Sequence, residues 1–278
     1  MRAAMILCAG LGTRLRPLSE WCAKPMVPIG DVPAVEHIAR RLRPSFAKLV
    51  VNVHHRPADV RAWAADAIAV SHEPVLLGTA GGIAKAAPLL GEGDVLVWNG
   101  DILVDLDVAS LVRAHRSDAT LVVVPREGRD GNVGLDDEGR VVRLRKESVA
   151  PETRSADFVG VQIVSARIRS LLPNEGCIVG DVYIPELARG ARIEAHVSAA
   201  SFTDIGSIAS YRAANRSWLG ERASWIGEGA VVNAPVDDSV IGANARIDAP
   251  AVRSVVWPGT HVTTPIADAV ATPFGVVS

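Results

Sequence analysis

The C-terminal part of the chain repeats one pattern with a period of 15 residues. When residues 226–240, 241–255 and 256–270 are aligned, branched apolar residues share two columns and proline shares a third. The members of these columns are Ile226, Ile241 and Val256, then Val232, Ile247 and Val262, then Pro235, Pro250 and Pro265. Single apolar positions separated by short turns predict stacked coils of short strands, because each coil buries its apolar residues against its neighbours. Three coils are few for a stable stack, so we expect them to pack on the rest of the chain or on another subunit of a homo-oligomer.

Within each coil the two branched residues lie six positions apart, and glycine follows the first of them at Gly227 and Gly242. This spacing resembles the hexapeptide repeats of left-handed β-helices, although the coils of that fold are usually longer. The resemblance implies a short, left-handed β-helix-like tail over residues 223–278, behind a larger domain over residues 1–222. The tryptophans expected to pack between the last helix and the coils are Trp218, Trp225 and Trp257.

The first 220 residues alternate between apolar runs and helical patterns. The runs that predict strands buried on both faces of a sheet are residues 3–8, 48–53, 94–98 and 120–124. The helical patterns cover residues 32–42, 58–68, 80–90, 108–115, 182–187 and 208–219. Residues 131–164 instead favour a hairpin and a further strand, as an insertion or an extension of the sheet edge. This order predicts an α/β fold with a Rossmann-like, mostly parallel sheet flanked by helices.

The composition excludes several classes of protein. The chain has 278 residues, of which 49% are apolar and 22% charged, with a formal net charge of −2. Disordered chains have less apolar content and more net charge, and nucleic-acid binders are usually basic. Cys8, Cys22 and Cys177 have no Cys-x-x-Cys spacing, which argues against a disulfide framework or a zinc site and for a reducing compartment. Because no apolar run has the length of a membrane span or a signal-peptide core, we expect a cytoplasmic protein.

A glycine-rich segment follows the first predicted strand. Gly10 and Gly12 let backbone N–H groups approach an anion closely, because no Cβ is in the way. Arg14 and Lys24 add positive charge to the same segment. Only four of the 29 basic residues are lysines, so Lys24 stands out from the background. A dinucleotide-binding pattern does not fit, since its third glycine would fall at Leu15 and no acid ends the second predicted strand.

Several segments together resemble the sugar-1-phosphate nucleotidyltransferases, the enzymes that make nucleotide sugars. The motifs that carry the resemblance are Gly10-Leu11-Gly12-Thr13-Arg14-Leu15 with Lys24-Pro25, Leu77-Gly78-Thr79-Ala80-Gly81-Gly82, Asn99-Gly100-Asp101, Phe158-Val159-Gly160-Val161, and Asp204-Ile205-Gly206-Ser207 with Tyr211. The resemblance implies attack of a sugar-phosphate oxygen on the α-phosphorus of a nucleoside triphosphate, with release of pyrophosphate. The implied partners are therefore a nucleoside triphosphate and a sugar 1-phosphate, with no nucleic acid and no membrane.

The resemblance also implies roles for individual residues. Arg14, Lys24 and Asp101 would be catalytic, and Asp101 with Asp204 would hold Mg²⁺, which prefers one or two carboxylates plus phosphate oxygens. The implied nucleotide-binding residues are Leu7, Ala9, Gly10, Gly12, Thr13, Gly78, Thr79 and Gly81. The implied sugar-phosphate-binding residues are Asn132, Lys146 and Gly160. At this last site the sequence departs from the family, because Lys146 lies between Arg145 and Glu147 where many members have Glu-Lys-Pro.

The resemblance points first to GTP and mannose 1-phosphate, and other functions stay open. One alternative is a uridylyltransferase acting on an amino-sugar or muramate 1-phosphate, since loops similar to residues 77–82 occur with several bases. Another is a non-catalytic regulatory subunit that senses nucleotide sugars. Such a subunit would be expected to have lost Arg14, Lys24 or one aspartate, and all of them are present. An acyltransferase, suggested by the β-helical coils, is disfavoured because three short coils offer no cleft.

Overall fold

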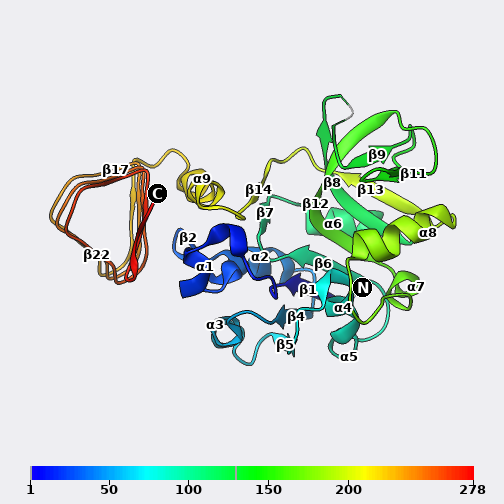
Figure 1. Cartoon of the computed structure of the whole chain (residues 1–278), viewed down its shortest axis with the longest axis horizontal. Helices are drawn as coiled ribbons and strands as arrows, with labels where there is room; N and C mark the ends of the chain where they lie inside the picture. Colours follow the sequence, from blue (N-terminus) through cyan, green and yellow to red (C-terminus); the bar gives the residue numbers. More distant parts are fainter. Residues whose placement is uncertain (1, 129) are drawn as a thin grey trace. The chain divides into compact units, whose positions relative to one another are not determined.

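The computed structural model describes residues 2–128 and 130–278, and the chain forms two units (Figure 1). The first unit comprises Met1–Gly10 and Ile38–Phe202, and the second comprises Leu11–His37 and Thr203–Ser278. Each unit is therefore assembled from segments that are far apart in the sequence. These units cut across the boundary expected at residue 222, and the division into domains 1–222 and 223–278 stays a prediction.

A parallel sheet forms the centre of the first unit. Strand β1 (Ala3–Leu7) pairs in parallel with both β4 (Lys48–Val53) and β6 (Val95–Asn99), and β5 (Ala69–His72) extends the sheet beyond β4. All residues of β1 before Leu7 are buried, so side chains on both faces of the strand are covered. Continuous apolar runs are typical of such strands, and the predicted positions of β1, β4 and β6 are confirmed.

The rest of this sheet is largely antiparallel. The added strands are β8 (Ala119–Arg126), β9 (Val133–Leu135), β10 (Val141–Leu144), β11 (Glu147–Ser148), β12 (Arg154–Val164) and β13 (Ile193–Val197). The long strand β12 runs antiparallel to β6, β8 and β9, whereas β13 runs parallel to β8. The short strands β7 (Ile102–Val104) and β14 (Phe202–Asp204) follow β6 and β13 in the chain.

The expectation of a mostly parallel sheet is therefore wrong, because the sheet is mixed. The reason lies in residues 131–164, where β9 and β10 are joined by the short turn that contains Gly139. Short turns can join only antiparallel neighbours, since parallel strands need a long crossover. The segment was expected as an insertion or an edge extension, but β12 lies inside the sheet beside β6.

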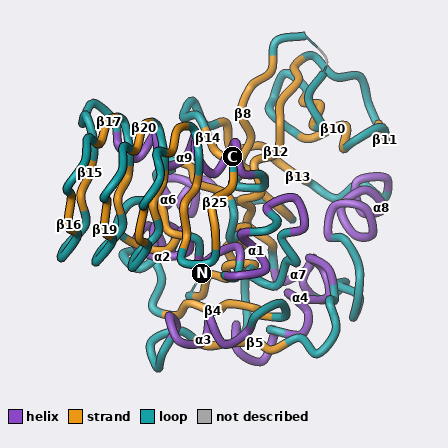
Figure 2. The backbone as a smooth tube through the Cα atoms, turned by 60° about the vertical axis from the view of Figure 1, so that its left-hand side comes forward, coloured by secondary structure: helices purple, strands orange, loops and turns teal. Residues whose placement is uncertain are grey.

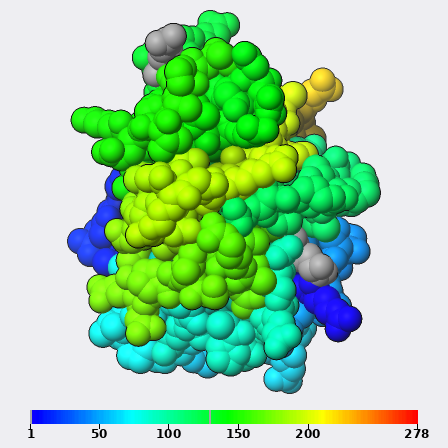
Figure 3. Space-filling view, turned by 90° about the vertical axis from the view of Figure 1, so that its right-hand side faces the viewer, coloured from blue at the N-terminus to red at the C-terminus, as the bar shows by residue number. Residues whose placement is uncertain are grey.

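Helices cover the sheet of the first unit, and Figure 3 shows one face of this unit, with the segment around α5 in cyan at the bottom and β9–β12 in green at the top. The helices are α3 (Pro57–Ala64), α4 (Gly78–Lys85), α5 (Ala87–Leu90), α6 (Val108–Ala114), α7 (Ala166–Arg169), the π-helix η3 (Ile178–Tyr183) and α8 (Ile184–Ala188). Asp107 caps α6 as predicted, because its side chain accepts a hydrogen bond from the Ser110 N–H. Among the described residues, no helix has the length and apolar character needed to cross a membrane.

Two of the predicted helices have different bounds in the structure, for local reasons. The helix predicted over residues 80–90 is divided at Ala86 into α4 and α5. Pro88 explains the break, because it has no N–H for the carbonyl of residue 84 and its ring crowds that carbonyl. The helix predicted over residues 32–42 begins later, as α2 (Ala34–Leu42), because β3 (Val32–Pro33) pairs with β2 (Pro28–Ile29).

In the second unit, helix α9 (Ile208–Leu219) packs against the segment that precedes α2. That segment contains η1 (Thr13–Leu15), α1 (Leu18–Trp21) and η2 (Lys24–Met26). The Tyr211 hydroxyl donates to the Pro28 carbonyl at 2.7 Å, and the Asn215 side chain accepts from the Gly30 N–H at 2.9 Å. A side chain at Gly30 would overlap the ring of Trp218, so the glycine allows the helix to approach closely.

The C-terminal repeat forms stacked coils (Figure 2). Its strands are β15 (Trp225–Ile226), β16 (Val231–Val232), β17 (Val236–Asp237), β18 (Val240–Ile241), β19 (Arg246–Ile247), β20 (Ala251–Val252), β21 (Val255–Val256), β22 (His261–Val262), β23 (Ile266–Ala267), β24 (Val270–Thr272) and β25 (Gly275–Val277). Three sheets hold them, and residues 15 positions apart pair in parallel, as in Ile226 with Ile241 and Ile241 with Val256. The period is therefore confirmed, and the arrangement is consistent with a β-helical tail. Its left-handedness, and its role in a homo-oligomer, stay predictions.

The coils contact α9 through aromatic side chains, as predicted. The rings of Trp218 and Trp225 meet edge to face, with their centroids 5.3 Å apart. The indole N–H of Trp257 donates to the Tyr211 hydroxyl at 2.9 Å. The same tyrosine donates to Pro28, so one buried hydroxyl connects the coils to the segment before α2.

A column of serines forms a hydrogen-bonded ladder along the stack. The Ser239 N–H donates to Ser224 Oγ, the Ser254 N–H to Ser239 Oγ, and the Ala269 N–H to Ser254 Oγ. These residues are 15 positions apart, so the ladder follows the repeat. The Ser254 hydroxyl also donates to the Val252 carbonyl at 2.7 Å, and its side chain is buried. Each hydroxyl of the ladder thus supplies the acceptor for an N–H of the next coil, in place of a backbone carbonyl.

We expect Ser254→Ala to lower the free energy of unfolding by about 1–3 kcal/mol, because it removes the acceptor of the Ala269 N–H, which lies in a buried residue. Urea denaturation checks this value. Ser224→Ala is the matched control, since Ser224 makes the same contact at the half-buried start of the ladder, where water can replace it. An equal loss in both variants would contradict the role given to the buried ladder.

Candidate functional site

Three charged side chains of the second unit converge where η1, η2 and the start of α9 meet. The Arg14 guanidinium lies 3.2 Å from Asp204 Oδ2, and Lys24 Nζ lies 3.7 Å from Asp204 Oδ1. Arg14 and Asp204 are 190 positions apart in the sequence. The packing of α9 on the segment before α2 therefore assembles a cluster that no local pattern contains.

The two cations of this cluster have different environments. The Lys24 side chain is 10% exposed, whereas the Arg14 side chain is 70% exposed. A buried ammonium group is costly unless a counter-charge is near, and Asp204 supplies that charge to Lys24. Lys24 is therefore held in one place, while Arg14 can move toward a ligand with little loss of contacts.

The way in which α9 begins leaves the Asp204 carboxylate available for other contacts. The helix is capped by Ser207, whose hydroxyl accepts from the Ser210 N–H, in a reciprocal capping box with Ser210. Asp204 therefore does not serve as the cap, which is the ordinary role of an aspartate just before a helix. Its Oδ1 atom is buried and makes no hydrogen bond among the described residues.

Glycines make the close approach of these groups possible. Gly12 has a φ of 64°, in the left-handed region, where it starts the turn into η1. A Cβ atom at Gly206 would lie 2.6 Å from Arg14 Nη2 and 2.8 Å from Asp204 Oδ1. Both glycines belong to the motifs singled out in the sequence, and any larger residue at Gly206 would displace the ion pair.

Leu7, Ala9, Gly10 and Asp101 belong to the first unit and lie at or just after the carboxyl ends of β1 and β6. The Gly100 N–H donates to the Leu7 carbonyl at 2.9 Å, which brings Asp101 next to the end of β1. Burial, and next the negative charge of Asp101, raise the pKa of the Cys8 thiol. Ligands of α/β sheets bind at this edge. Ala9 is buried, whereas Gly10 is exposed and has open space where a Cβ would be.

The glycine-rich first turn of α4, which contains Gly78, Thr79 and Gly81, lies against residues 174–178. The Ala80 N–H donates to the Gly176 carbonyl at 2.9 Å, and the Thr79 hydroxyl accepts from the Ile178 N–H at 2.8 Å. Gly78 has a φ of 72°, and a Cβ there would overlap the Gly176 carbonyl. A Cβ at Gly81 would likewise overlap the Asn174 carbonyl. The supporting segment 174–178 had no recognisable sequence signal.

The expected sugar-phosphate residues divide into two groups. Asn132 and Gly160 both contact the region around β12: the Asn132 side chain accepts from the Phe158 N–H, and Gly160 has a φ of 82° where its Cα packs beside Asn99. Lys146 is exposed in the turn between β10 and β11. Its neighbour Arg145 instead reaches η3, where its guanidinium donates to Cys177 Sγ at 3.1 Å.

Arg145 changes the chemistry of Cys177. Burial alone would raise the pKa of this thiol, but hydrogen bonds from the backbone N–H groups of Gly180 and Val179, together with the charge of Arg145, outweigh burial and lower it. The Cys177 N–H donates to Asp181 at 2.6 Å. This cluster was missed in the sequence because its members come from separate segments without a shared motif.

Two further polar residues were missed. Asn52 and Glu73 are buried side chains at the ends of β4 and β5, and they bond to each other at 2.7 Å. Asn52 lies within the run predicted as a strand over residues 48–53, and Glu73 precedes Gly78 by five positions. The sequence signal that could have identified this pair was Asn52, a polar residue within an apolar run.

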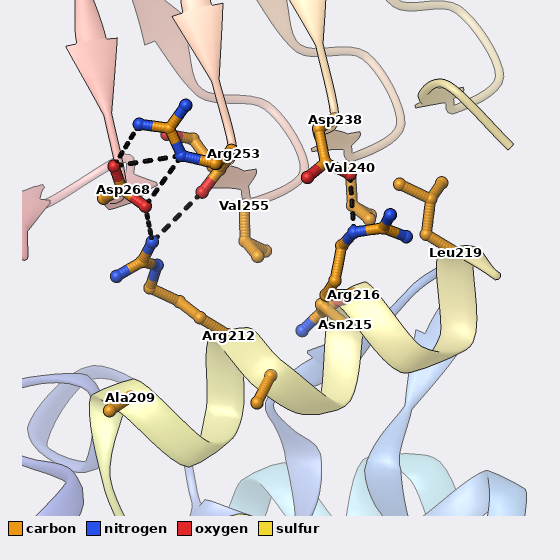
Figure 4. A pocket seen from close by; sticks show the side chains of 12 residues that line it. Ala209, Arg212, Asn215, Arg216, Leu219, Asp238, Val240, Arg253, Val255 and Asp268 are labelled. Carbon is orange, nitrogen blue, oxygen red and sulfur yellow. Dashed lines mark hydrogen bonds and ion pairs between the residues drawn. The ribbon is translucent and has the colours of Figure 1, made fainter. Parts of the chain in front are cut away.

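A separate cavity of about 310 Å³ lies between α9 and the turns of the coils (Figure 4). Its arginines are paired: Arg212 and Arg253 both bond to Asp268, and Arg216 bonds to Asp238. Hydrogen bonds from Arg253 and Arg212 lower the pKa of Asp268 to about 2, so this carboxylate stays charged at neutral pH. The cavity is therefore lined by ion pairs, and these pairs connect the helix to the coils.

The expected metal-binding residues form no dense cluster. Among residues 2–128 and 130–278, no group of three or more His, Cys, Asp or Glu side chains is arranged to hold a metal ion. Sites for Mg²⁺ often use only one or two carboxylates, with phosphate oxygens and water as the other ligands. Asp101 and Asp204 have the hard oxygen donors that this ion prefers, and the buried Oδ1 of Asp204 has no hydrogen-bond donor among the described residues.

Several known proteins are similar to this chain. The family model described as nucleotidyl transferase matches residues 3–151, which is more than half of the chain. The chain is 30% identical over 244 residues to the UTP–glucose-1-phosphate uridylyltransferase of Synechocystis, with 78% of this chain and 63% of that protein covered. It is 32% identical over 221 residues to the mannose-1-phosphate guanylyltransferase of Mycobacterium tuberculosis, with 73% and 61% covered. The chain thus spans less than two thirds of the length of these two relatives.

A shorter relative and a solved structure are also similar. The chain is 36% identical over 179 residues to the N-acetylmuramate alpha-1-phosphate uridylyltransferase of Neisseria meningitidis, with 58% of this chain and 74% of that protein covered. The crystal structure of HddC from Yersinia pseudotuberculosis complexed with GMP-PN has a TM-score of 0.66 at 23% identity, and covers 78% of this chain and 100% of that one. At this identity the structural likeness concerns the fold.

We expect Gly78→Ala to lower the free energy of unfolding by about 1–3 kcal/mol, because a left-handed φ strains any residue with a Cβ. The overlap with the Gly176 carbonyl adds to this loss. Chemical denaturation measures it. Gly10→Ala should leave the stability unchanged, since its Cβ would meet open space. If both variants were as stable as the original protein, the packing described for the first turn of α4 would be wrong.

Proposed function

The chain belongs to the nucleotidyl transferase family, and on that premise we propose that it transfers a nucleotidyl group from a nucleoside triphosphate to a sugar 1-phosphate. Pyrophosphate is the leaving group. The observation that carries the proposal is the cluster of Arg14, Lys24 and Asp204, in which two cations are gathered on one carboxylate. Two anionic substrates must meet in this reaction, so the protein has to neutralise charge and align the reacting groups.

Lys24 and Arg14 are proposed to stabilise the phosphate charge that grows as the new bond forms. A unit charge at about 4 Å contributes roughly 4 kcal/mol at an effective dielectric constant near 20. Only the share that increases in the transition state accelerates the reaction. Lys24 is the better placed of the two, because its buried side chain is preorganised by Asp204, whereas solvent screens the exposed Arg14.

Backbone groups of two glycine segments are proposed to bind the nucleotide. Gly10, Gly12 and Thr13 would offer N–H groups to the phosphates, next to Leu7 and Ala9. In the second segment Gly78, Thr79 and Gly81 would face the base, with the Thr79 hydroxyl kept in place by the Ile178 N–H. Asn132, Lys146 and Gly160 are proposed to contact the sugar phosphate.

We propose that the reaction depends on Mg²⁺, with Asp101 and Asp204 as the carboxylate ligands. Their oxygen donors fit this ion, and the buried Oδ1 of Asp204 has no hydrogen-bond donor among the described residues. When bound, the ion would neutralise phosphate charge. Asp204 would also keep Lys24 and Arg14 near the phosphates, since it pairs with both.

For the substrates, we propose GTP and mannose 1-phosphate. The mannose-1-phosphate guanylyltransferase of Mycobacterium tuberculosis, 32% identical over 221 residues, supports this choice. The alternative is UTP with a muramate or amino-sugar 1-phosphate, which is supported by the 36% identity to the N-acetylmuramate alpha-1-phosphate uridylyltransferase. A non-catalytic sensor is disfavoured because Arg14, Lys24, Asp101 and Asp204 are all present. Nucleoside triphosphates are cytoplasmic, and we propose that the reaction takes place there.

Pyrophosphate release tests the proposed activity. The protein is incubated with Mg²⁺, each nucleoside triphosphate in turn and a panel of sugar 1-phosphates. Release with GTP and mannose 1-phosphate is the expected result, and release only with UTP and an amino-sugar phosphate would support the alternative. No release with any pair would overturn the proposal and favour a regulatory subunit.

We expect Lys24→Ala to lower kcat by on the order of 10²–10³-fold, as for the loss of one preorganised stabilising group. Arg14→Ala should fall at the lower end of this range, because solvent already screens that side chain. Steady-state kinetics of pyrophosphate release measure both effects. Lys48→Ala removes an exposed lysine at the start of β4 and should keep full activity. Full activity in Lys24→Ala would remove this residue from the mechanism.

We expect chelation with EDTA to abolish turnover and Mg²⁺ to restore it. Asp101→Asn should raise the Mg²⁺ concentration at half-maximal rate at least about tenfold, because it removes a charged ligand. Asp105→Asn is the control, since Asp105 lies just after β7 in the same part of the chain, its side chain is 84% exposed and it pairs with Arg41. A Mg²⁺ titration that is the same in all three proteins would show that Asp101 does not bind the ion.

A further inference from the structure

A buried polar chain crosses the carboxyl edge of the sheet in the first unit. The Asn52 side-chain oxygen accepts from the Cys8 N–H at 2.7 Å, and its amide nitrogen donates to Glu73 Oε1 at 2.7 Å. The other carboxylate oxygen of Glu73 accepts from the Leu77 N–H at 3.1 Å. Glu73 is fully buried and Asn52 is 3% exposed. Four groups from three separate segments are thus connected by three hydrogen bonds.

The two ends of this polar chain lie in two different connections of the sheet, one after β1 and one before α4. Cys8 follows β1 and leads to Gly10, while Leu77 immediately precedes Gly78. In the ladder between β1 and β4, Leu7 is the last residue paired, and it lies opposite Asn52. The Asn52 side chain then supplies the acceptor for the next N–H in place of a backbone carbonyl. The backbone can therefore leave the sheet at Cys8 without an unsatisfied buried group.

Gly82 lies against the Asn52–Glu73 pair. A Cβ at this position would lie 2.7 Å from Glu73 Oε1 and 2.8 Å from Asn52 Nδ2. Helix α4 therefore packs its backbone directly on the bond between the two side chains. The position of this helix, and of its glycine-rich first turn, depends on the Asn52–Glu73 pair.

We propose that Asn52 and Glu73 are positioning residues that couple the two nucleotide-binding loops, so that phosphate and base segments are held in one mutual arrangement. The inference rests on the proposed function, because that function assigns the two loops to one nucleotide. Neither side chain needs to touch the nucleotide, since each acts through backbone N–H groups. The loop after β1 and the loop before α4 would then shift together when the pair is broken.

The donor and acceptor groups of Asn52 and Glu73 permit only one pattern of hydrogen bonds. Glu73 accepts twice, and Asn52 accepts from Cys8 and donates to Glu73. In Glu73→Gln either the contact to Asn52 or the contact to Leu77 becomes a donor facing a donor. In Asn52→Asp two carboxylates face each other. The double variant reverses the central bond, because the amide introduced at position 73 can donate to the carboxylate introduced at position 52. Both outer acceptors remain, and the number of heavy atoms does not change.

The experiment compares Asn52→Asp, Glu73→Gln and the double variant with the original protein. Thr120→Val is the matched control: it breaks a buried 2.7 Å hydrogen bond to His115 in the same unit, remote in sequence from both loops. Gly82→Ala adds a perturbation that pushes on the pair without changing its polar groups. The probes are GTP and UTP without sugar phosphate, and amide hydrogen exchange of the protein alone.

Each single variant and Gly82→Ala should bind the nucleotide on the order of tenfold or more weakly, the range expected for one unsatisfied buried group. Exchange should become faster at residues 8–10 and at residues 77–79 together. The double variant should restore affinity and protection to within about threefold, and KM for the sugar phosphate should stay unchanged. Thr120→Val should lower the thermal stability but leave the nucleotide affinity and both segments unchanged.

Exchange that changes at only one of the two segments would overturn the coupling. So would single variants that bind as tightly as the original protein, or a double variant no better than the singles. A double variant with restored protection but a changed preference between GTP and UTP would show that Glu73 contacts the base directly. If the original protein neither binds nor turns over nucleotide, the proposed function fails, whereas the exchange result still decides whether the two segments are coupled.

Discussion

The packing of α9 against the segment before α2 is the interaction on which the charged cluster depends. Tyr211, Asn215 and Trp218 hold this segment through the Pro28 carbonyl, the Gly30 N–H and the surface of Gly30. The same helix begins shortly after Asp204, whose carboxylate meets Arg14 and Lys24. Because Tyr211 also accepts from Trp257, one buried hydroxyl connects the coils to the segment that carries Arg14 and Lys24. The C-terminal repeat is therefore part of the structure that supports the site residues, as well as a separate module.

Burial decides how the polar groups of both units can act. Lys24 is buried against Asp204, so its charge is held in place before any substrate arrives. In the first unit, Asn52 and Glu73 are buried among backbone N–H groups, where every donor and acceptor must be satisfied. Such groups tolerate few alternatives, because an unpaired polar atom in the interior costs more than an exposed one. Arg14 and Lys146 are exposed by comparison and can adapt to a ligand.

Much of the fold could be predicted, because it depends on patterns of residues that are close together in the sequence. The period of 15 residues gave the register of the coils, and the apolar runs gave β1, β4 and β6. The mixed character of the sheet was missed, since the apolar run around β12 does not reveal the direction in which the strand runs. The break at Ala86 is caused by Pro88, and the late start of α2 is caused by the pairing of β2 with β3. Neither feature was predicted. Arg145 with Cys177, and Asn52 with Glu73, were not found because each pair joins segments more than 20 positions apart.

By itself the sequence determined the elements, the repeat and the chemical character of the motifs, because these depend on residues close together in the chain. It also contained the resemblance that leads to the nucleotidyl transferase family, which residues 3–151 match. Only the tertiary structure decided which charges meet. Asp204 lies beside Lys24 because α9 packs on the segment before α2, and Arg145 rather than Lys146 reaches η3 because of the turn after β10. The physical reason is that hydrogen bonds and ion pairs act over a few ångströms, and the distance along a chain does not specify which groups folding brings within that range.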